Sequence, residues 1–122
     1  MKLEELEIYQ IALELSDDFW QIFQDLPKQF QFSIGDQMLR SVDSIGANIA
    51  EGYGRYYYKD SIRFYYHSRG SLFESKYWLQ LLFTRNLIKE DKYNELKNKL
   101  ELLGVKLNNF ISSIKNIAAN YK

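Results

Sequence analysis

The only histidine of the chain, His67, limits the chemistry that the sequence supports. The chain has no cysteine, so disulfides, thiolate metal sites and cysteine nucleophiles are all excluded. A di-iron site in a helical bundle needs two Glu-x-x-His pairs, which one histidine cannot supply. A Ser-His-acid triad would have to use His67, and the residues around it lack the pattern of a nucleophile elbow. The sequence therefore predicts a protein that is not an enzyme, without catalytic residues, metal site, cofactor or small-molecule substrate.

The segment from Tyr53 to Arg69 interleaves cations with aromatic rings. Cations bind phosphates, and aromatic faces stack on unpaired bases at ~1–3 kcal/mol per base. We therefore predict that any nucleic-acid contact uses this segment, and the candidate residues are Arg55, Lys59, Arg63, Tyr57 and Arg69. The alternative is that half of these aromatic residues form core and the rest cover an oligomer interface, where Tyr and Arg are also enriched.

Charge is distributed unevenly along the chain, although the formal net charge is zero. Residues 1–25 hold seven acids and one base, whereas residues 52–89 hold seven bases and two acids. Such asymmetry marks a nucleic-acid or partner surface in some proteins. It is equally compatible with helices of opposite sign that lie side by side and neutralise each other.

Helices must position these residues, and apolar spacing predicts where they run. The first helix ends at Leu26-Pro27, because the residue before proline avoids the α region, and its inward face is Ile8, Ala12, Leu15, Phe19, Ile22 and Leu26. A second helix is expected from about Gly35 to Glu51. The following Gly52-Tyr53-Gly54 lacks the rest of a dinucleotide-binding fingerprint, and we interpret it as a stop in which glycine takes the left-handed conformation.

A third helix is expected from about Lys59 to Asn86. Serine alternates with bulky residues on its inward stripe, which indicates close approach of a neighbouring helix: Ser61, Tyr65, Ser68, Leu72, Ser75, Leu79 and Leu82. Gly70 costs up to ~1 kcal/mol relative to alanine inside a helix, which predicts a packing reason for it. The fourth helix has the longest apolar repeat: Tyr93, Leu96, Leu100, Leu103, Leu107, Phe110, Ile114 and Ile117.

Short connections between long helices make neighbouring helices antiparallel. The sequence thus predicts an all-α protein with one domain over residues 1–122, an antiparallel up-down-up-down four-helix bundle. No apolar run approaches the ~18 residues that span a bilayer, and the acidic start lacks the apolar region of a signal peptide. We therefore expect a cytoplasmic protein without a membrane partner.

The second helix also carries a polar stripe in helical register: Gln37, Ser41, Ser44, Asn48 and Glu51. Solvated helix faces usually carry Lys and Glu, whereas small polar residues suit a helix that hydrogen-bonds to another backbone. We therefore predict that the stripe is an internal or intersubunit polar seam, largely buried, and not a solvent-exposed face.

Residues 37–55 resemble the signature block of the bacterial four helix bundle protein family, which comprises proteins encoded in intervening sequences of large-subunit ribosomal RNA genes and their relatives. Arg69-Gly70-Ser71-Leu72-Phe73-Glu74 resembles the second block of that family. The motif residues correspond to Gln37, Arg40, Ser44, Asn48, Glu51, Gly52, Gly54, Arg55, Gly70, Ser71 and Glu74. These residues are structural or interface residues as readily as functional ones.

The resemblance implies an antiparallel four-helix bundle that assembles into a cyclic homo-oligomer, with pentamers known in the family. It supplies no catalytic residue. A distant relative, the accessory protein of diversity-generating retroelements, is strongly basic and binds nucleic acid, whereas this chain is neutral. We expect a non-enzymatic homo-oligomeric helical bundle, a homopentamer, with structured RNA of ribosomal or retroelement-related type as its partner. The alternative is a protein-interaction scaffold without nucleic acid.

Overall fold

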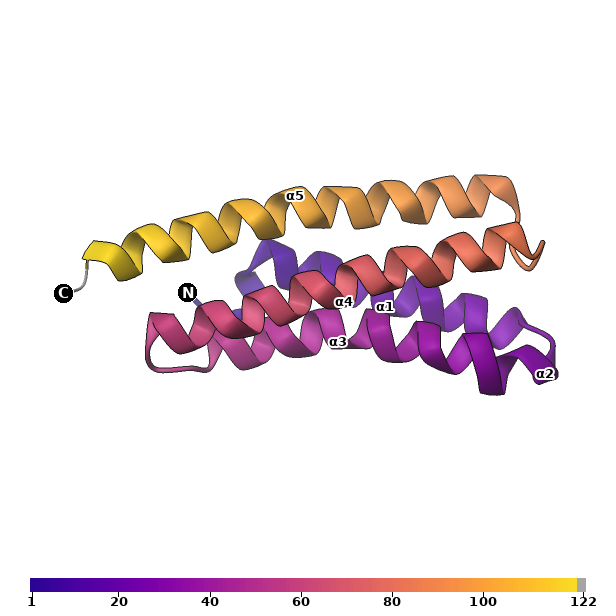
Figure 1. Ribbon diagram of the computed structural model, residues 1–122, viewed down its shortest axis with the longest axis horizontal. Helices are drawn as coiled ribbons and strands as arrows, with labels where there is room; N and C mark the ends of the chain where they lie inside the picture. The colour runs from indigo at the N-terminus through magenta and orange to yellow at the C-terminus, as the bar shows by residue number, and fades with distance from the viewer. Residues whose placement is uncertain (121–122) are drawn as a thin grey trace.

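The computed structural model describes residues 1–120 and contains four long helices joined by short connections (Figure 1). They are α1 (Glu7–Asp25), α3 (Asp36–Tyr53), α4 (Tyr58–Thr84) and α5 (Glu90–Asn120). A single 3-10 turn, η1 (Leu3–Glu5), precedes α1. The short α2 (Lys28–Phe30) and the π-helical segment η2 (Gln31–Gly35) lead directly into α3. No strand occurs in residues 1–120, so the all-α prediction is confirmed for them.

Consecutive long helices run antiparallel, and each packs against two others (Figure 1). Helix α3 lies between α1 and α4, and α5 lies between α4 and α1. Helices α1 and α4 therefore occupy diagonal positions, and the predicted antiparallel four-helix bundle is confirmed. In the described part of the chain, no helix has the length and apolar character to cross a membrane.

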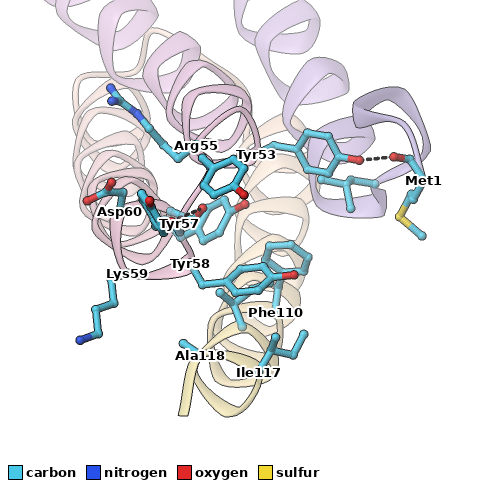
Figure 2. A pocket seen from close by; sticks show the side chains of 15 residues that line it. Met1, Tyr53, Arg55, Tyr57, Tyr58, Lys59, Asp60, Phe110, Ile117 and Ala118 are labelled. Atoms are coloured by element: carbon cyan, nitrogen blue, oxygen red, sulfur yellow. Dashed lines mark hydrogen bonds between the residues drawn. The ribbon is translucent and has the colours of Figure 1, made fainter. Parts of the chain in front are cut away.

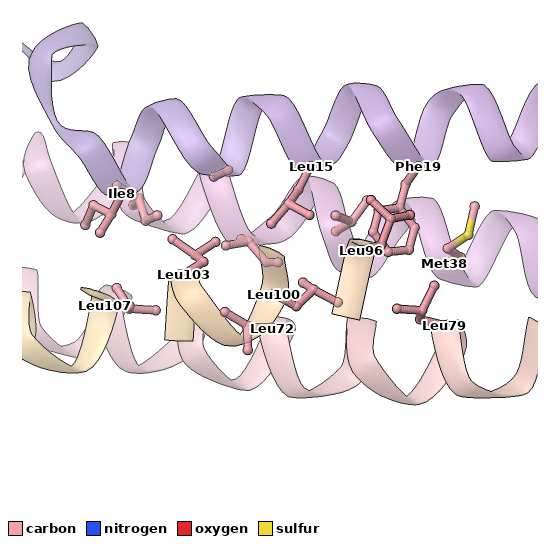
Figure 3. Packing of buried hydrophobic residues seen from close by; sticks show 14 of the residues in the cluster. Ile8, Leu15, Phe19, Met38, Leu72, Leu79, Leu96, Leu100, Leu103 and Leu107 are labelled. Atoms are coloured by element: carbon pink, nitrogen blue, oxygen red, sulfur yellow. The ribbon is translucent and has the colours of Figure 1, made fainter. Parts of the chain in front are cut away.

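The apolar core follows the predicted stripes (Figure 3). All six residues predicted for the first helix are buried, and so are all seven of the stripe predicted for the third. In α5 the buried register runs through Leu96, Leu100, Leu103 and Leu107, and then continues at Ile111 instead of Phe110. Phe110 and Ile114 are only half-buried, because this end of α5 has fewer neighbours.

Helices α3 and α4 approach each other through small residues, as the serine alternation predicted. The hydroxyl of Ser68 donates to the carbonyl of Ile45 at 2.8 Å, and the hydroxyl of Ser75 donates to that of Ser41 at 3.2 Å. A Cβ atom at Gly52 would lie 2.6 Å from the ring of Tyr65, so only glycine fits there. Small residues on both α3 and α4 therefore allow the close approach of these two helices.

Helix α3 ends at Tyr53, within the stop predicted at Gly52-Tyr53-Gly54, but the left-handed conformation predicted there is wrong. No glycine in residues 1–120 has a positive φ. The contact with Tyr65 explains Gly52 instead. Gly70 also differs from its prediction, because a Cβ atom placed there would meet nothing within 4 Å. Inside a single chain, Gly70 therefore has no packing reason.

The polar stripe of α3 is not an internal seam, so that form of the prediction is wrong. Of its five residues only Ser41 is buried, while Gln37 and Glu51 are exposed. The half-buried Ser44 donates to the carbonyl of Arg40 at 2.7 Å, and Asn48 donates to that of Ser44 at 2.8 Å. These side chains donate to carbonyls one turn back in their own helix, so they need no acceptor on the backbone of another helix. The intersubunit form remains a prediction.

Candidate nucleic-acid interface

Three consecutive tyrosines lie at one end of the bundle, where the connection between α3 and α4 leads into the first residue of α4. Tyr57 precedes α4 in an extended conformation. Successive helical residues are rotated by about 100°, so three consecutive tyrosines cannot all point inward. Tyr56 is 89% exposed, Tyr57 is 66% exposed and Tyr58 is also exposed.

Arg55 and Arg63 both lie over the ring of Phe64. Their guanidinium carbons are 4.5 and 5.1 Å from the ring centroid. Arg55 also pairs with Glu51 at 2.5 Å, and the His67 ring lies 5.9 Å from Phe64. A guanidinium carries five N–H donors, so Arg55 keeps donors for a phosphate beyond the one that pairs with Glu51. The structure thus brings two of the predicted phosphate contacts to one aromatic ring.

The other two predicted cations lie elsewhere. Lys59 extends away from the tyrosines and toward a different side from Arg55 (Figure 2). The guanidinium of Arg69 lies 4.8 Å from the Tyr66 ring and donates to Asn108 on α5 at 3.3 Å. Lys115 of α5 approaches the same Tyr66 ring at 5.5 Å. The sequence did not reveal Lys115, because it joins this group only through the packing of α5 on α4.

Three acids of α1 pair with lysines of α5. The Lys99 ammonium lies 2.8 Å from Asp18 and 3.9 Å from Glu14, and Lys106 lies 2.8 Å from Glu7. The hydrogen bond to Asp18 raises the pKa of Lys99, although partial burial opposes this shift. Opposite charges on adjacent helices therefore neutralise each other, but these helices are α1 and α5. The bases of α4 lie diagonally across the bundle from the acids of α1.

An open groove of about 1170 Å³ lies beside the tyrosines at this end of the bundle (Figure 2). Its lining includes Tyr57 from the connection, Tyr58 and Tyr65 from α4, and Phe110 and Ile117 from α5. Burial and the neighbouring Tyr53 and Tyr58 raise the pKa of Tyr65 to about 12. This groove was not predicted from the sequence, although the apolar repeat of the last helix continues to Ile117.

The motif residues are spread along α3 and α4 and form no compact site within the chain. Gln37, Gly54 and Gly70 are exposed. Arg40 pairs with Asp36 at 2.9 Å, Glu74 accepts from the Trp78 indole at 3.3 Å, and the Ser71 carbonyl accepts from Ser75 at 2.9 Å. Most of these contacts stay within one helix, and Gly52 alone is required by packing between helices.

His67 is exposed, and its ring packs against Phe64 and not in a cleft. Over residues 1–120, no three His, Asp or Glu side chains are grouped closely enough to hold a metal ion.

The chain shares its sequence pattern and its fold with known proteins. The sequence matches the 23S rRNA-intervening sequence protein family over residues 4–109. The structure is similar to the crystal structure of a protein of unknown function from the S23 ribosomal protein family of Bacteroides thetaiotaomicron. The TM-score is 0.80 and the sequences are 28% identical, over 85% of this chain and 97% of that chain. No curated protein matches closely enough to count as a relative. The family match spans most of the chain and both motif blocks, so this chain belongs to the family of 23S rRNA-intervening sequence proteins.

Proposed function

We propose that this chain is a non-enzymatic, homo-oligomeric helical bundle that binds structured RNA at the connection between α3 and α4. The observation that carries the proposal is the pair of guanidinium groups of Arg55 and Arg63 on one ring, beside three exposed tyrosines. The acids of α1 that form ion pairs lie against α5, and α4, which carries Arg63, lies diagonally from α1. The family is named after intervening sequences of 23S rRNA, which makes ribosomal RNA the first RNA to test.

The test is an RNA titration with the wild type and with a variant carrying Arg55→Glu and Arg63→Glu. Phosphate contacts release counterions, so the wild type should bind more weakly at about 200 mM than at about 50 mM salt. Losing two contacts should lower the affinity for all RNA sequences and reduce the salt slope by about two.

The matched control is the double variant with Arg85→Glu and Lys89→Glu. Both residues are exposed bases at the other end of the bundle, so their reversal changes net charge equally and leaves the proposed surface intact. Equal RNA affinity of the wild type and the Arg55/Arg63 variant, or no salt dependence in the wild type, would contradict the proposal.

Self-association is proposed from the large apolar side chains that the single chain leaves exposed. One set lies on α1, at Leu13 and Trp20, and another lies on α4 and α5: Phe73, Tyr77, Leu102 and Val105. Gly70, where an added Cβ atom would meet nothing within 4 Å among the described residues, lies one turn from Phe73. The first set lies in the acidic part of the sequence, and much of the second lies in its basic part. A head-to-tail contact between two such surfaces closes into a ring when its rotation allows, and we propose a ring of five.

A protein-interaction scaffold without nucleic acid is the second candidate. The largely apolar groove beside Tyr57 and the zero net charge of the chain favour it. Failure to bind RNA at low salt, together with saturable binding of a defined protein partner, would support this second function.

A further inference from the structure

One end of the bundle is left open because the four helices do not end at the same level. Helix α3 stops at Tyr53 and α4 starts at Tyr58, whereas α5 continues to Asn120 and reaches beyond them (Figure 1). The groove described above, here named the tyrosine groove, is this open end. Its floor includes Tyr65 and Phe110, whose rings meet edge to face with centroids 5.1 Å apart. One wall is α5, and the other is the connection that carries Tyr57.

Within residues 1–120, Tyr56 and Tyr57 are exposed, and the contact between their rings leaves ring faces uncovered. Tyr56 and Tyr57 meet nearly at right angles, with centroids 4.9 Å apart and planes 81° apart. By contrast, the planes of Phe83 and Tyr93 lie 11° apart with centroids 4.4 Å apart, so each of these rings covers a face of the other. An edge-to-face pair leaves flat faces free, and a planar ring from another molecule can stack on them.

The polar groups of the tyrosine groove suit a neutral heteroaromatic ring. The Tyr65 hydroxyl is protonated at neutral pH, and burial and its tyrosine neighbours raise its pKa further, to about 12. The Ser61 hydroxyl also lines the groove, and Asp60 is its one carboxylate among the described residues. Hydroxyl groups both donate and accept, as the edges of nucleobases require. Two cations of the same short segment, Arg55 and Lys59, border the groove and outnumber Asp60.

We propose that the tyrosine groove takes unpaired bases of RNA, with Tyr57 stacking on a base. The inference rests on the proposed RNA-binding function and adds the class of RNA, which is single-stranded loops and ends. A duplex keeps its bases stacked inside, so it reaches only the cations, whereas a loop also reaches the ring faces. The groove volume of about 1170 Å³ gives room for a base and its sugar.

The experiment compares three fluorescently labelled RNAs by anisotropy: a hairpin with an unpaired loop, the same hairpin with abasic sites in the loop, and a duplex of equal length. The abasic hairpin keeps every phosphate and loses only the bases. The intact hairpin should bind about 5- to 150-fold more tightly than the abasic one for each base that stacks. The duplex should bind like the abasic hairpin.

Variants test whether this difference in affinity between the two hairpins arises in the tyrosine groove. Tyr57→Ala should bring the intact hairpin down to the affinity of the abasic one, whereas Tyr57→Phe should preserve the difference. Ile117→Asp should weaken the intact hairpin alone, because it places a carboxylate in the groove wall. The matched control is Phe32→Ala, which removes an exposed ring of η2 that lies outside the groove and outside the two proposed self-association surfaces. Helical circular dichroism and melting temperature confirm that each variant is folded.

Two failures are distinguishable. If the wild type binds the intact and the abasic hairpin equally and binding still weakens with salt, the base-binding groove is overturned and the phosphate surface of Arg55 and Arg63 stands. If none of the three RNAs binds at low salt, the proposed function itself is overturned, and the groove is then a site for a protein segment.

Discussion

At Gly52, the backbone of α3 passes so close to the ring of Tyr65 that a hydrogen atom is the largest substituent that fits. Because both residues are buried, Gly52→Ala should displace the ring and destabilise the fold by ~1–3 kcal/mol. Gly104→Ala is the control, since its nearest neighbour is the Leu72 methyl at an ordinary 3.7 Å. Removing that helical glycine should stabilise the protein by up to ~1 kcal/mol. Urea unfolding of both variants measures the two changes, and shifts of the same sign would contradict this account.

Tyr65 also links stability to alkaline pH. Its folded-state pKa is about 12, above the ordinary value of 10.0, so the folded state resists ionisation of this hydroxyl. The stabilisation is fully present below pH 10 and is lost as the pH rises toward 12, because the unfolded chain releases the proton first. The unfolding free energy should fall by about 2–3 kcal/mol more in the wild type than in Tyr65→Phe across this range. Parallel curves for the two proteins, from urea unfolding at several pH values, would rule out this linkage.

At the scale of elements, the contact between α3 and α4 depends on serine being both small and hydrogen-bonded. Ser68→Ala keeps the size and loses only the bond to the Ile45 carbonyl, which should cost ~0.5–1.5 kcal/mol. Ser68→Leu should cost more, ~1–3 kcal/mol or above, because it must push two helices apart in a fully buried place. Ser112→Leu on the exposed face of α5 should change stability by less than about 0.5 kcal/mol. Thermal unfolding gives all three values, and a Leu variant at Ser68 as stable as the Ala variant would refute close packing.

The long helices were predictable because each carries an apolar stripe that only one surface of the bundle can bury. Ile8 to Leu26 and Ser61 to Leu82 were therefore assigned to the core correctly. The local pattern did not reveal where polar groups find partners. The pattern predicted that Ser44 and Asn48 belong to a polar seam, yet the side chain of each donates a hydrogen bond to a carbonyl of its own helix. Likewise, Gly52 was interpreted only as part of a helix stop, because the local sequence does not show that the Tyr65 ring of another helix packs against it.

At the scale of the whole molecule, the candidate site was predictable only in part. Arg55 and Arg63 were identified from the interleaving of cations and aromatic rings, which is a local feature of the sequence. The tyrosine groove depends on the relative levels at which α3, α4 and α5 end, and spacing within one helix carries no information about that. The contribution of Lys115 likewise depends on how α5 packs against α4.

The oligomeric state is the property of the whole molecule that the exposed surfaces predict most directly. Light scattering at micromolar concentration should give a multiple of 14.6 kDa, with five copies expected. Gly70→Trp should reduce the mass to that of one chain while the helical content stays unchanged, because the added ring meets nothing inside the chain and would collide with a neighbouring copy. Phe73→Lys should act in the same way, since it places a charge on the exposed apolar surface. The control is Phe32→Lys, which alters an exposed ring on η2, outside the two proposed surfaces, and should leave the mass unchanged. A wild type that scatters as a clean 14.6 kDa monomer would refute the ring, and a Gly70→Trp protein that keeps the full oligomer mass would move the contact away from this face of α4.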